Sequence, residues 1–151
     1  MALKVVEPVV VGSDHAGYEM KEFVKKYLTE RSIPFFDAGA ETLDPQDGYP
    51  AFAFKVAQNV ASGQYTRGIL MCGTGIGASI AANRVKKVRA ALCYSPEMAK
   101  MSRLHNNSNI LVLGGRTTPT DIAAKIMDAW IETEFEGGRH QKRIDEMDVV
   151  C

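Results

Sequence analysis

The chain has 151 residues, of which 46% are hydrophobic and 24% charged, so it is expected to fold as one globular domain over residues 1–151. Lys plus Arg and Asp plus Glu both number 18, and this balance gives no overall field that favours nucleic acid or an anionic membrane. No long apolar run and no export leader stand out, which predicts a cytoplasmic protein without a membrane partner.

The cysteine content argues against disulfides and against a cysteine-based metal site. Cys72, Cys93 and Cys151 are odd in number and lack the short spacings of zinc ligands. Free thiols fit a reducing compartment, and we assign no role to Cys93 or Cys151.

The first half of the chain alternates between strand and helix patterns. A β-branched run from Val9 ends in polar residues and glycine at 13–17, which predicts a buried parallel strand and its loop. Apolar residues at helical spacing follow and stop before Pro34, as in an amphipathic helix. A short strand, a loop with Tyr49 near its end, and a further helix are expected at 33–37, 38–50 and 52–61.

The second half continues this alternation. A third strand ends at Cys72, and the helix after its glycine-rich loop is expected to run to about Val85. Ser95 and Thr118 are each followed by proline, and this pattern predicts that they cap two more helices. The remaining expected elements are strands at 88–94 and 109–113, a long helix stopped by glycines at 137–138, and a tail at 139–148 that can form a short helix.

Five alternations of strand and helix predict an α/β fold, a three-layer αβα sandwich around a five-stranded parallel Rossmann-like sheet. In such sheets the working site lies at the carboxyl ends of the strands. This rule predicts that three segments lie close together, namely Asp14 with His15, residues 72–77, and Arg116. The segment at 105–107 ends a helix instead, so it joins these residues only through tertiary folding or from a partner chain.

The most informative stretch is the loop at residues 72–77, which reads Cys-Gly-Thr-Gly-Ile-Gly. Its three alternating glycines let the backbone turn N–H groups inward, and the helix that follows adds unpaired N–H groups and a positive dipole end. Such a loop attracts negative charge. The same field favours a thiolate, so Cys72 is a candidate base or nucleophile, with a buried small residue at a strand end as the alternative.

Two other kinds of site use a similar loop. Gly73, Gly75 and Ala78 fit a dinucleotide fingerprint, but that motif follows the first strand and needs an acidic residue after the next strand, where this chain has Cys-Tyr-Ser at 93–95. A phosphatase-like cysteine loop needs arginine six residues after the cysteine, and that position is Ala78. A phosphocysteine carrier or phosphate-binding module lacks this requirement and remains an alternative.

Three further groups offer chemistry, and each also has a purely structural interpretation. Asp14 and His15 can act as an acid and base pair or can simply cap the first helix. His105 can serve as a general acid, or the asparagines after it can simply end a helix. Arg139 and Arg143 share a face if the tail is helical and can then clasp one phosphate, or they can be solvated.

Four motifs together resemble those of the ribose-5-phosphate isomerase B group, within the sugar-phosphate isomerases that also include galactose-6-phosphate isomerase. The resemblance runs from about Val9 to Ile144, and the order of the motifs makes it specific. The motifs are Ser-Asp-His-Ala-Gly at 13–17, Cys-Gly-Thr-Gly-Ile-Gly at 72–77, His-Asn-Asn-Ser-Asn at 105–109 and Gly-Gly-Arg-His-Gln-Lys-Arg at 137–143.

This resemblance implies an isomerase that interconverts D-ribose 5-phosphate and D-ribulose 5-phosphate in the pentose phosphate pathway, through a cis-enediol(ate) and without metal or other cofactor. By matching position, Cys72 is the base that moves a proton between C2 and C1. His105 assists opening of the furanose ring, and the Thr74 hydroxyl is a partner in that step. The backbone amides of the anion hole are those of Gly73, Thr74, Gly75, Ile76 and Gly77.

The resemblance also implies contacts between several loops and the substrate. Asp14 and Asn106 match residues that contact sugar hydroxyls, and Tyr49 matches a contact to the side of the sugar ring. The phosphate is held by cationic groups, namely His15, Arg116, Arg139 and Arg143.

Members of this group are homodimers, often dimers of dimers, whose sites combine residues of two chains. The resemblance therefore implies that the tail at 137–151 packs at a subunit interface. One branch of the family uses glutamate as base at the position of Ala78 and lacks the cysteine, so this chain matches the cysteine branch. Galactose-6-phosphate isomerase subunits share the cysteine loop, and hexose phosphates such as allose or galactose 6-phosphate stay open as alternative substrates.

Overall fold

The structure is a computed structural model that describes residues 7–42, 44 and 46–150. Its strands are β1 (Val9–Ser13), β2 (Phe35–Asp37), β3 (Arg67–Cys72), β4 (Ala90–Leu92) and β5 (Ile110–Gly114). Its helices are the 3₁₀ turn η1 (His15–Gly17) and α1 (Tyr18–Glu30), α2 (Tyr49–Ala61), α3 (Ile76–Ala82), α4 (Pro96–Asn106), α5 (Thr120–Glu132) and α6 (Arg139–Val149). None of the helices described is long and apolar enough to cross a membrane. Cys151 lies outside the described residues.

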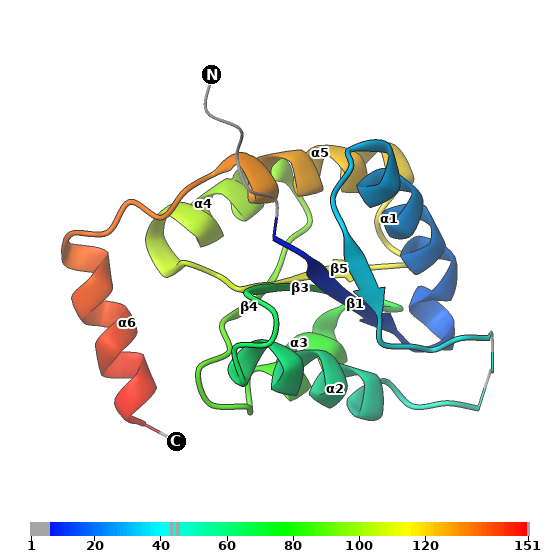
Figure 1. Cartoon of the computed structure of the whole chain (residues 1–151), viewed down its shortest axis with the longest axis horizontal. Helices are drawn as coiled ribbons and strands as arrows, with labels where there is room; N and C mark the ends of the chain where they lie inside the picture. Colours follow the sequence, from blue (N-terminus) through cyan, green and yellow to red (C-terminus); the bar gives the residue numbers. More distant parts are fainter. Residues whose placement is uncertain (1–6, 43, 45, 151) are drawn as a thin grey trace.

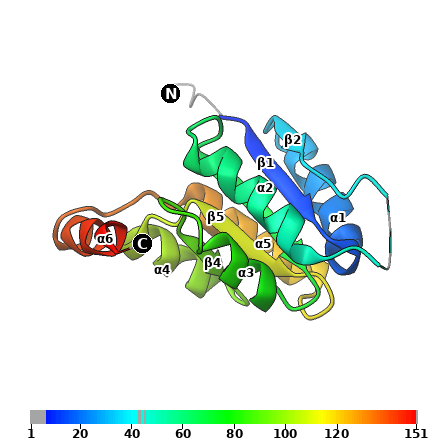
Figure 2. The same cartoon turned by 90° about the horizontal axis from the view of Figure 1, so that it is seen from below.

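The five strands form one parallel sheet in the order β2-β1-β3-β5-β4 (Figure 1). Helices α1, α4 and α5 cover one face and α2 and α3 cover the other, which confirms the predicted three-layer αβα sandwich (Figure 2). Side chains alternate between the faces, so that Val11 and Met71 pack in the core under α1 and α5, while Val10 and Leu70 pack under α2. Because both faces are covered, the central strands are almost wholly aliphatic.

A buried polar network joins α4, α5 and the start of β5. Trp130 is fully buried, and its indole Nε1 donates a hydrogen bond to Ser108 Oγ at 2.9 Å. Ser108 Oγ also lies 2.8 Å from Ser102 Oγ, which donates to the carbonyl group of Ala99. The buried side-chain polar atoms of Trp130, Ser108 and Ser102 thus each have a partner, as packing in an apolar core requires.

Helix α5 ends at Glu132, so the prediction that glycines at 137–138 stop it is wrong. Two arginines from other elements bind the carbonyl groups at its end. Arg67 Nη1 lies 3.4 and 3.5 Å from two carbonyl oxygens of the last turn, and Arg103 Nε donates to the carbonyl of Thr133 at 3.2 Å. These contacts supply hydrogen-bond donors to carbonyl groups that another helical turn would otherwise satisfy. After Glu132 the chain continues in extended form.

The ends of several other helices can be compared with the predicted ones. Ser95 caps α4 as predicted, because its side chain accepts an N–H of the first turn at 3.2 Å. Thr118 does not cap α5, since the helix begins after Pro119 and the Thr118 side chain is buried where the chain turns away from β5. Tyr49 begins α2 instead of closing the preceding loop, and α3 ends at Ala82, earlier than expected.

Helix α6 stands apart from the sandwich (Figure 1). Glycines at 137–138 have φ values of 75° and 58° and redirect the chain into this helix, which is a full 11 residues long. The helix contacts α4 and buries His140 and Ile144. Its far end and the segment before β4 both line a cavity of about 620 Å³, and two of the lining residues form an ion pair, with Arg89 Nη1 3.9 Å from Asp148 Oδ2.

Replacing Ser108 by alanine should lower the free energy of unfolding by about 1–3 kcal/mol, because the buried indole N–H of Trp130 loses its acceptor. Urea denaturation measures this loss. In a Trp130→Phe background the same substitution should cost less, since no donor is left unpaired there. Equal costs in the two backgrounds would contradict a stabilising role for this hydrogen bond.

Candidate active site

The loops that follow β1, β3 and β5 meet at the carboxyl edge of the sheet, as predicted. These three strands are neighbours in the sheet, so their ends lie side by side. The N–H of Gly115 donates to the carbonyl of Cys72 at 2.7 Å, and the N–H of Arg116 donates to the carbonyl of Gly73 at 2.9 Å. The loop after β5, with the exposed Arg116 side chain, is thereby fixed against the cysteine loop.

Cys72 is the last residue of β3 and is 4% exposed. It packs in the core on the α2 and α3 side of the sheet, together with Ala53 and Ala78. The thiol therefore lies on the face of the sheet that α2 and α3 cover. The first residues of these helices, Tyr49 and Ile76, lie at the glycine loop.

Close contacts shape the glycine loop. Gly75 has φ 84°, and a Cβ added there would lie 2.5 Å from a side-chain carbon of β4. A Cβ on Gly77 would lie 2.5 Å from Cζ of Tyr49, so the tyrosine ring packs directly on the loop. Thr74 Oγ1 accepts the N–H of Ile76 at 3.2 Å. The loop conformation is thus held by contacts that larger residues at 75 and 77 would break.

The segment after β1 carries Asp14 and His15, and the structure gives each a partner. Asp14 Oδ1 accepts the N–H of Gly17 at 3.1 Å and so caps the turn η1, whereas the predicted helix α1 begins after Gly17 without a side-chain cap. Asp47 Oδ1 accepts the backbone N–H of His15 at 2.8 Å and lies 2.9 Å from the ring Nδ1. Sequence reasoning missed Asp47, because its partner is 32 residues away in the chain.

Tyr94 is a second residue that sequence reasoning missed. Its hydroxyl donates to the carbonyl of Thr74 and lies 3.4 Å from Thr117 Oγ1. Tyr94 thus ties the glycine loop to the loop after β5. The sequence signal that could have identified Tyr94 was its position just after β4, at the carboxyl edge of the sheet.

His105 and Asn106 lie at the opposite, amino-terminal edge of the sheet. Helix α4 runs back from the carboxyl end of β4 and ends at Asn106, shortly before β5 begins (Figure 2). Arg89, which precedes β4, donates from Nε to the carbonyl of Asn106 at 3.0 Å. Within one chain, Cys72 and His105 are therefore separated by the length of the sheet.

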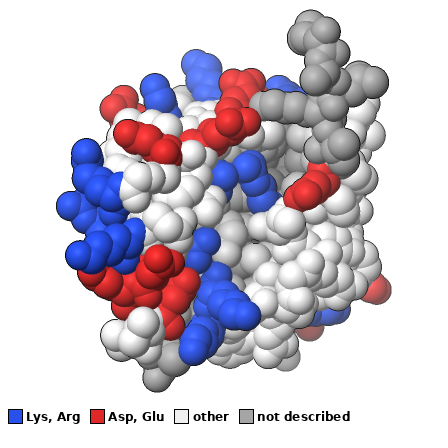
Figure 3. All heavy atoms as spheres, turned by 60° about the vertical axis from the view of Figure 1, so that its left-hand side comes forward, with Lys and Arg blue, Asp and Glu red and all other residues white. Residues whose placement is uncertain are grey.

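Arg139 and Arg143 lie on the same side as His105. The tail is helical, so these arginines share one face as their spacing predicts. Both are exposed, and neither forms a hydrogen bond or ion pair with another residue that the structure describes. Figure 3 shows Lys and Arg side chains gathered on this face of the molecule beside a hollow.

His140 is a third residue that sequence reasoning missed. Its ring stacks on that of His105, with centroids 4.4 Å apart and an interplanar angle of 21°. Burial, together with the nearby His105 ring and Arg139 guanidinium, lowers the pKa of His140 below its ordinary value. Glu136 Oε2 lies 3.9 Å from His105 Nε2 and 3.8 Å from His140 Nε2.

Two clusters each place three potential metal ligands within 4.8 Å of one another. In the cluster at the carboxyl edge, the histidine ring already pairs with a carboxylate at 2.9 Å. In the cluster beside α6, the carboxylate oxygen lies 3.8 and 3.9 Å from the two imidazole nitrogens, which is beyond hydrogen-bond distance. The two sets are Asp14, His15 and Asp47, and His105, Glu136 and His140.

Comparisons with known proteins agree on one family. Residues 9–147 match the family model described as Ribose/Galactose Isomerase. Ribose-5-phosphate isomerase B of Escherichia coli is 39% identical over 145 residues, which cover 96% of this chain and 97% of that protein.

Solved structures extend the likeness to the whole fold. The structure of a ribose 5-phosphate isomerase from Thermotoga maritima has a TM-score of 0.92 and 47% identity, and the match covers 95% of this chain and 99% of that one. Ribose-5-phosphate isomerase B from Mycoplasma genitalium with bound ribulose-5-phosphate has a TM-score of 0.90 and 40% identity over 94% of each chain.

The family model spans both groups of candidate residues, from β1 to α6. The solved relatives share the arrangement of strands and helices that places these groups at the two edges of the sheet. The chain therefore belongs to the ribose/galactose isomerase family.

Proposed function

We propose that this chain interconverts D-ribose 5-phosphate and D-ribulose 5-phosphate, as an enzyme of the cytoplasmic pentose phosphate pathway. The observation that carries the proposal is the contact of the Cys72 loop with the loop after β5 and with Tyr49 at the carboxyl edge of the sheet. The names of the relatives and the ribulose-5-phosphate bound to one of them support the same substrate.

The proposed reaction moves a proton from C2 to C1 of the open-chain aldose, while a hydroxyl proton moves from O2 to O1. Cys72 as thiolate removes the proton from C2, and the resulting thiol returns it to C1. The cis-enediolate between these steps carries negative charge on oxygen. Amide groups of residues 73–77 donate to this oxygen, and such donors typically contribute ~3 kcal/mol each. This scheme needs no metal or other cofactor.

We assign the second group of residues to the other protomer of a homodimer. The partner subunit's His105 opens the furanose ring with help from Thr74, and the partner subunit's Asn106 binds a sugar hydroxyl. The separation of Cys72 and His105 within one chain supports this shared site, since a symmetric dimer can bring opposite edges of two sheets together.

The tail at 137–151 is the segment that we expect at the subunit interface. Helix α6 packs on its own chain through only part of its surface. Its end leaves apolar side chains in solvent, with Met147, Val149 and Val150 exposed at 49%, 79% and 82%. Burial against a second copy would remove this apolar surface from water.

The proposed phosphate site combines cations from both protomers. One protomer supplies His15 and Arg116, and its partner supplies two α6 arginines, the partner subunit's Arg139 and the partner subunit's Arg143. Guanidinium groups without a partner among the residues that the structure describes are suited to bind a phosphate dianion. Binding energy gained at the phosphate holds the sugar against the base, with Asp14 and Tyr49 beside it.

A hexose phosphate is the second candidate substrate, because the description of the family names galactose beside ribose. A six-carbon sugar places one more carbon between C1 and the phosphate, so it needs a longer site. Values of kcat/KM for ribose 5-phosphate, allose 6-phosphate and galactose 6-phosphate, measured side by side, distinguish the two assignments. We expect the highest value for ribose 5-phosphate.

Replacing Cys72 by alanine should lower kcat for ribose 5-phosphate by at least about 100-fold, because the general base is lost. The control is Cys93→Ala, which removes a buried thiol whose burial raises its pKa to about 11 and which should leave kcat unchanged. Wild-type kcat in the Cys72 variant would overturn the mechanism. Phosphate trapped on Cys72, without turnover, would instead support a phosphocysteine carrier.

Replacing Arg139 by alanine should raise KM for ribose 5-phosphate by roughly 10-fold or more, because one charge-assisted hydrogen bond to the phosphate is lost. The value of kcat should change much less, since the arginine lies far from C1 and C2. Lys142→Ala on the same helix is the matched control for loss of charge. An unchanged KM would instead support the alternative that the Arg139 side chain is only solvated.

Shared sites predict rescue between two inactive variants. Cys72→Ala and His105→Ala chains, unfolded and refolded together in equal amounts, should recover about a quarter of the wild-type activity, since each mixed dimer contains one site with neither substitution. Each variant refolded alone is the control. Failure of the mixture to exceed these controls, although mixed dimers are detected by mass spectrometry, would contradict a site built from two chains.

A further inference from the structure

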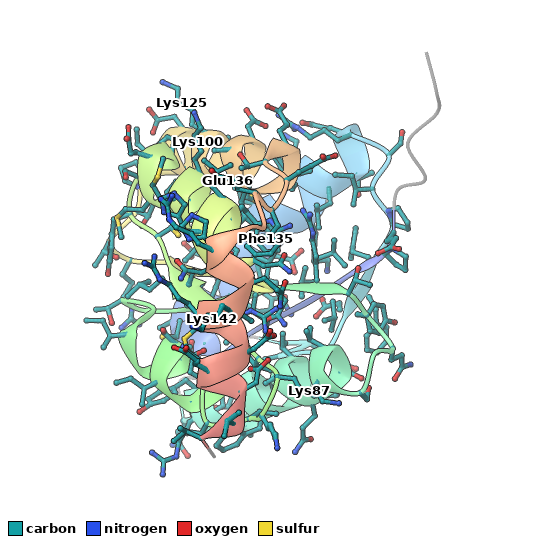
Figure 4. All side chains as sticks on the ribbon, turned by 90° about the vertical axis from the view of Figure 1, so that its left-hand side faces the viewer. Lys87, Lys100, Lys125, Phe135, Glu136 and Lys142 are labelled. Atoms are coloured by element: carbon teal, nitrogen blue, oxygen red, sulfur yellow. The ribbon has the colours of Figure 1, made fainter. Side chains whose placement is uncertain are left out.

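A cluster of three potential ligands lies where α4, the linker after α5 and the first turn of α6 meet. Figure 4 shows Glu136 at the entry to α6, beside the end of α4. The N–H of Glu136 donates to the carbonyl of Leu104 at 3.1 Å, which fixes the linker against α4. The turn at 137–138 then brings His140 back onto His105. Three separate elements thus converge on one point.

His140 contains an unsatisfied polar atom at this point. The residue is 5% exposed, and its Nε2 is buried without a hydrogen-bond partner among the described residues. The Glu136 carboxylate faces it at 3.8 Å, beyond hydrogen-bond distance. A buried ring nitrogen without a partner costs free energy, so its retention calls for a ligand that the nitrogen can bind.

We propose that His105, Glu136 and His140 form a Zn²⁺ site. Two imidazoles and one carboxylate are a common set of three protein ligands for zinc, and they leave the fourth position to water. In tetrahedral coordination, donors about 2.0–2.2 Å from one ion lie about 3.3–3.6 Å apart, so the separations of 3.8 and 3.9 Å from the carboxylate must each shorten by a few tenths of an ångström when the ion binds. The His105 side chain is 41% exposed and is free to adjust its ring.

The choice of zinc follows from the donor set. Imidazole nitrogen favours zinc and other late transition metals, whereas Mg²⁺ and Ca²⁺ prefer a full set of oxygen ligands. The cluster of Asp14, His15 and Asp47 is a weaker candidate, because its imidazole is already paired with a carboxylate at 2.9 Å. The site beside α6 also contains no thiol, which distinguishes it from zinc bound to Cys72.

The functional consequence is inhibition, and this part rests on the proposed isomerase function. Zinc that occupies Nε2 of His105 removes the group assigned to ring opening. Zinc is therefore a reversible inhibitor and not a cofactor, and removal of zinc by a chelator restores activity. Binding itself does not depend on the activity of the chain, so the two parts can be tested separately.

Calorimetric titration of the tag-free full chain with Zn²⁺ tests binding. We expect one ion per chain, and we expect Glu136→Gln and His140→Gln each to weaken binding by more than the 10- to 100-fold typical of lost outer-shell partners. Glu146→Gln is the matched control, since it removes an exposed carboxylate from the same region and should bind zinc as the wild type does. Equal affinity in the wild type and in both ligand variants, or no binding by the wild type, would overturn the site.

Substitution of Co²⁺ for zinc identifies the ligand atoms by absorption. We expect ligand-field bands without a sulfur-to-metal charge-transfer band, and the same spectrum in Cys72→Ala. A charge-transfer band that disappears in Cys72→Ala would place the metal on the thiol and overturn the proposal.

Activity measurements test the inhibition. Zn²⁺ should inhibit the wild type and Glu146→Gln, and excess chelator should reverse this. Glu136→Gln should keep wild-type activity without zinc and resist inhibition by at least 10-fold in zinc concentration. Equal inhibition of both variants would refute the link to this cluster. A chain that binds zinc through the cluster but turns over no sugar phosphate would refute the proposed function alone.

Discussion

The parallel direction of the five strands is the constraint on which the rest of the molecule depends. Parallel strands place all their carboxyl ends at one edge, and each connecting helix must return to the other edge before the next strand begins. The order β1-β3-β5 at the centre of the sheet brings three loops into contact through the backbone bonds of Gly115 and Arg116. The same geometry sends the ends of α4 and α5 away from Cys72.

Much of the fold could be predicted because its signals are local. The β-branched run at Val9 and the glycines after Cys72 act through their own backbone preferences and through burial on both faces of the sheet. The end of α5 could not be predicted, since Arg67 and Arg103 reach it from distant parts of the chain. Local glycines at 137–138 gave a stop signal, but they redirect the chain into α6 instead.

The candidate site shows the same division. The loop residues could be located from strand ends alone, as Cys72 shows, whereas the packing of the Tyr49 ring on Gly77 joins distant parts of the chain and had no signal in the sequence. Asp47 and Tyr94 were missed because they act on residues 32 and 20 positions away. Such pairings leave no periodicity or spacing in the sequence, so only the folded chain reveals them.

Helix α6 connects stability with the proposed chemistry. An isolated helix of 11 residues is marginal in water, and α6 buries only His140 and Ile144 against its own chain. Its order therefore depends on contacts at its first turns and on any further surface that covers its exposed apolar end. Because Arg139 and Arg143 belong to these same first turns, whatever fixes His140 against α4 also fixes the arginines assigned to the phosphate. Subunit association, zinc binding and substrate binding would then all act on α6. Each of these events would change the free energy of the other two.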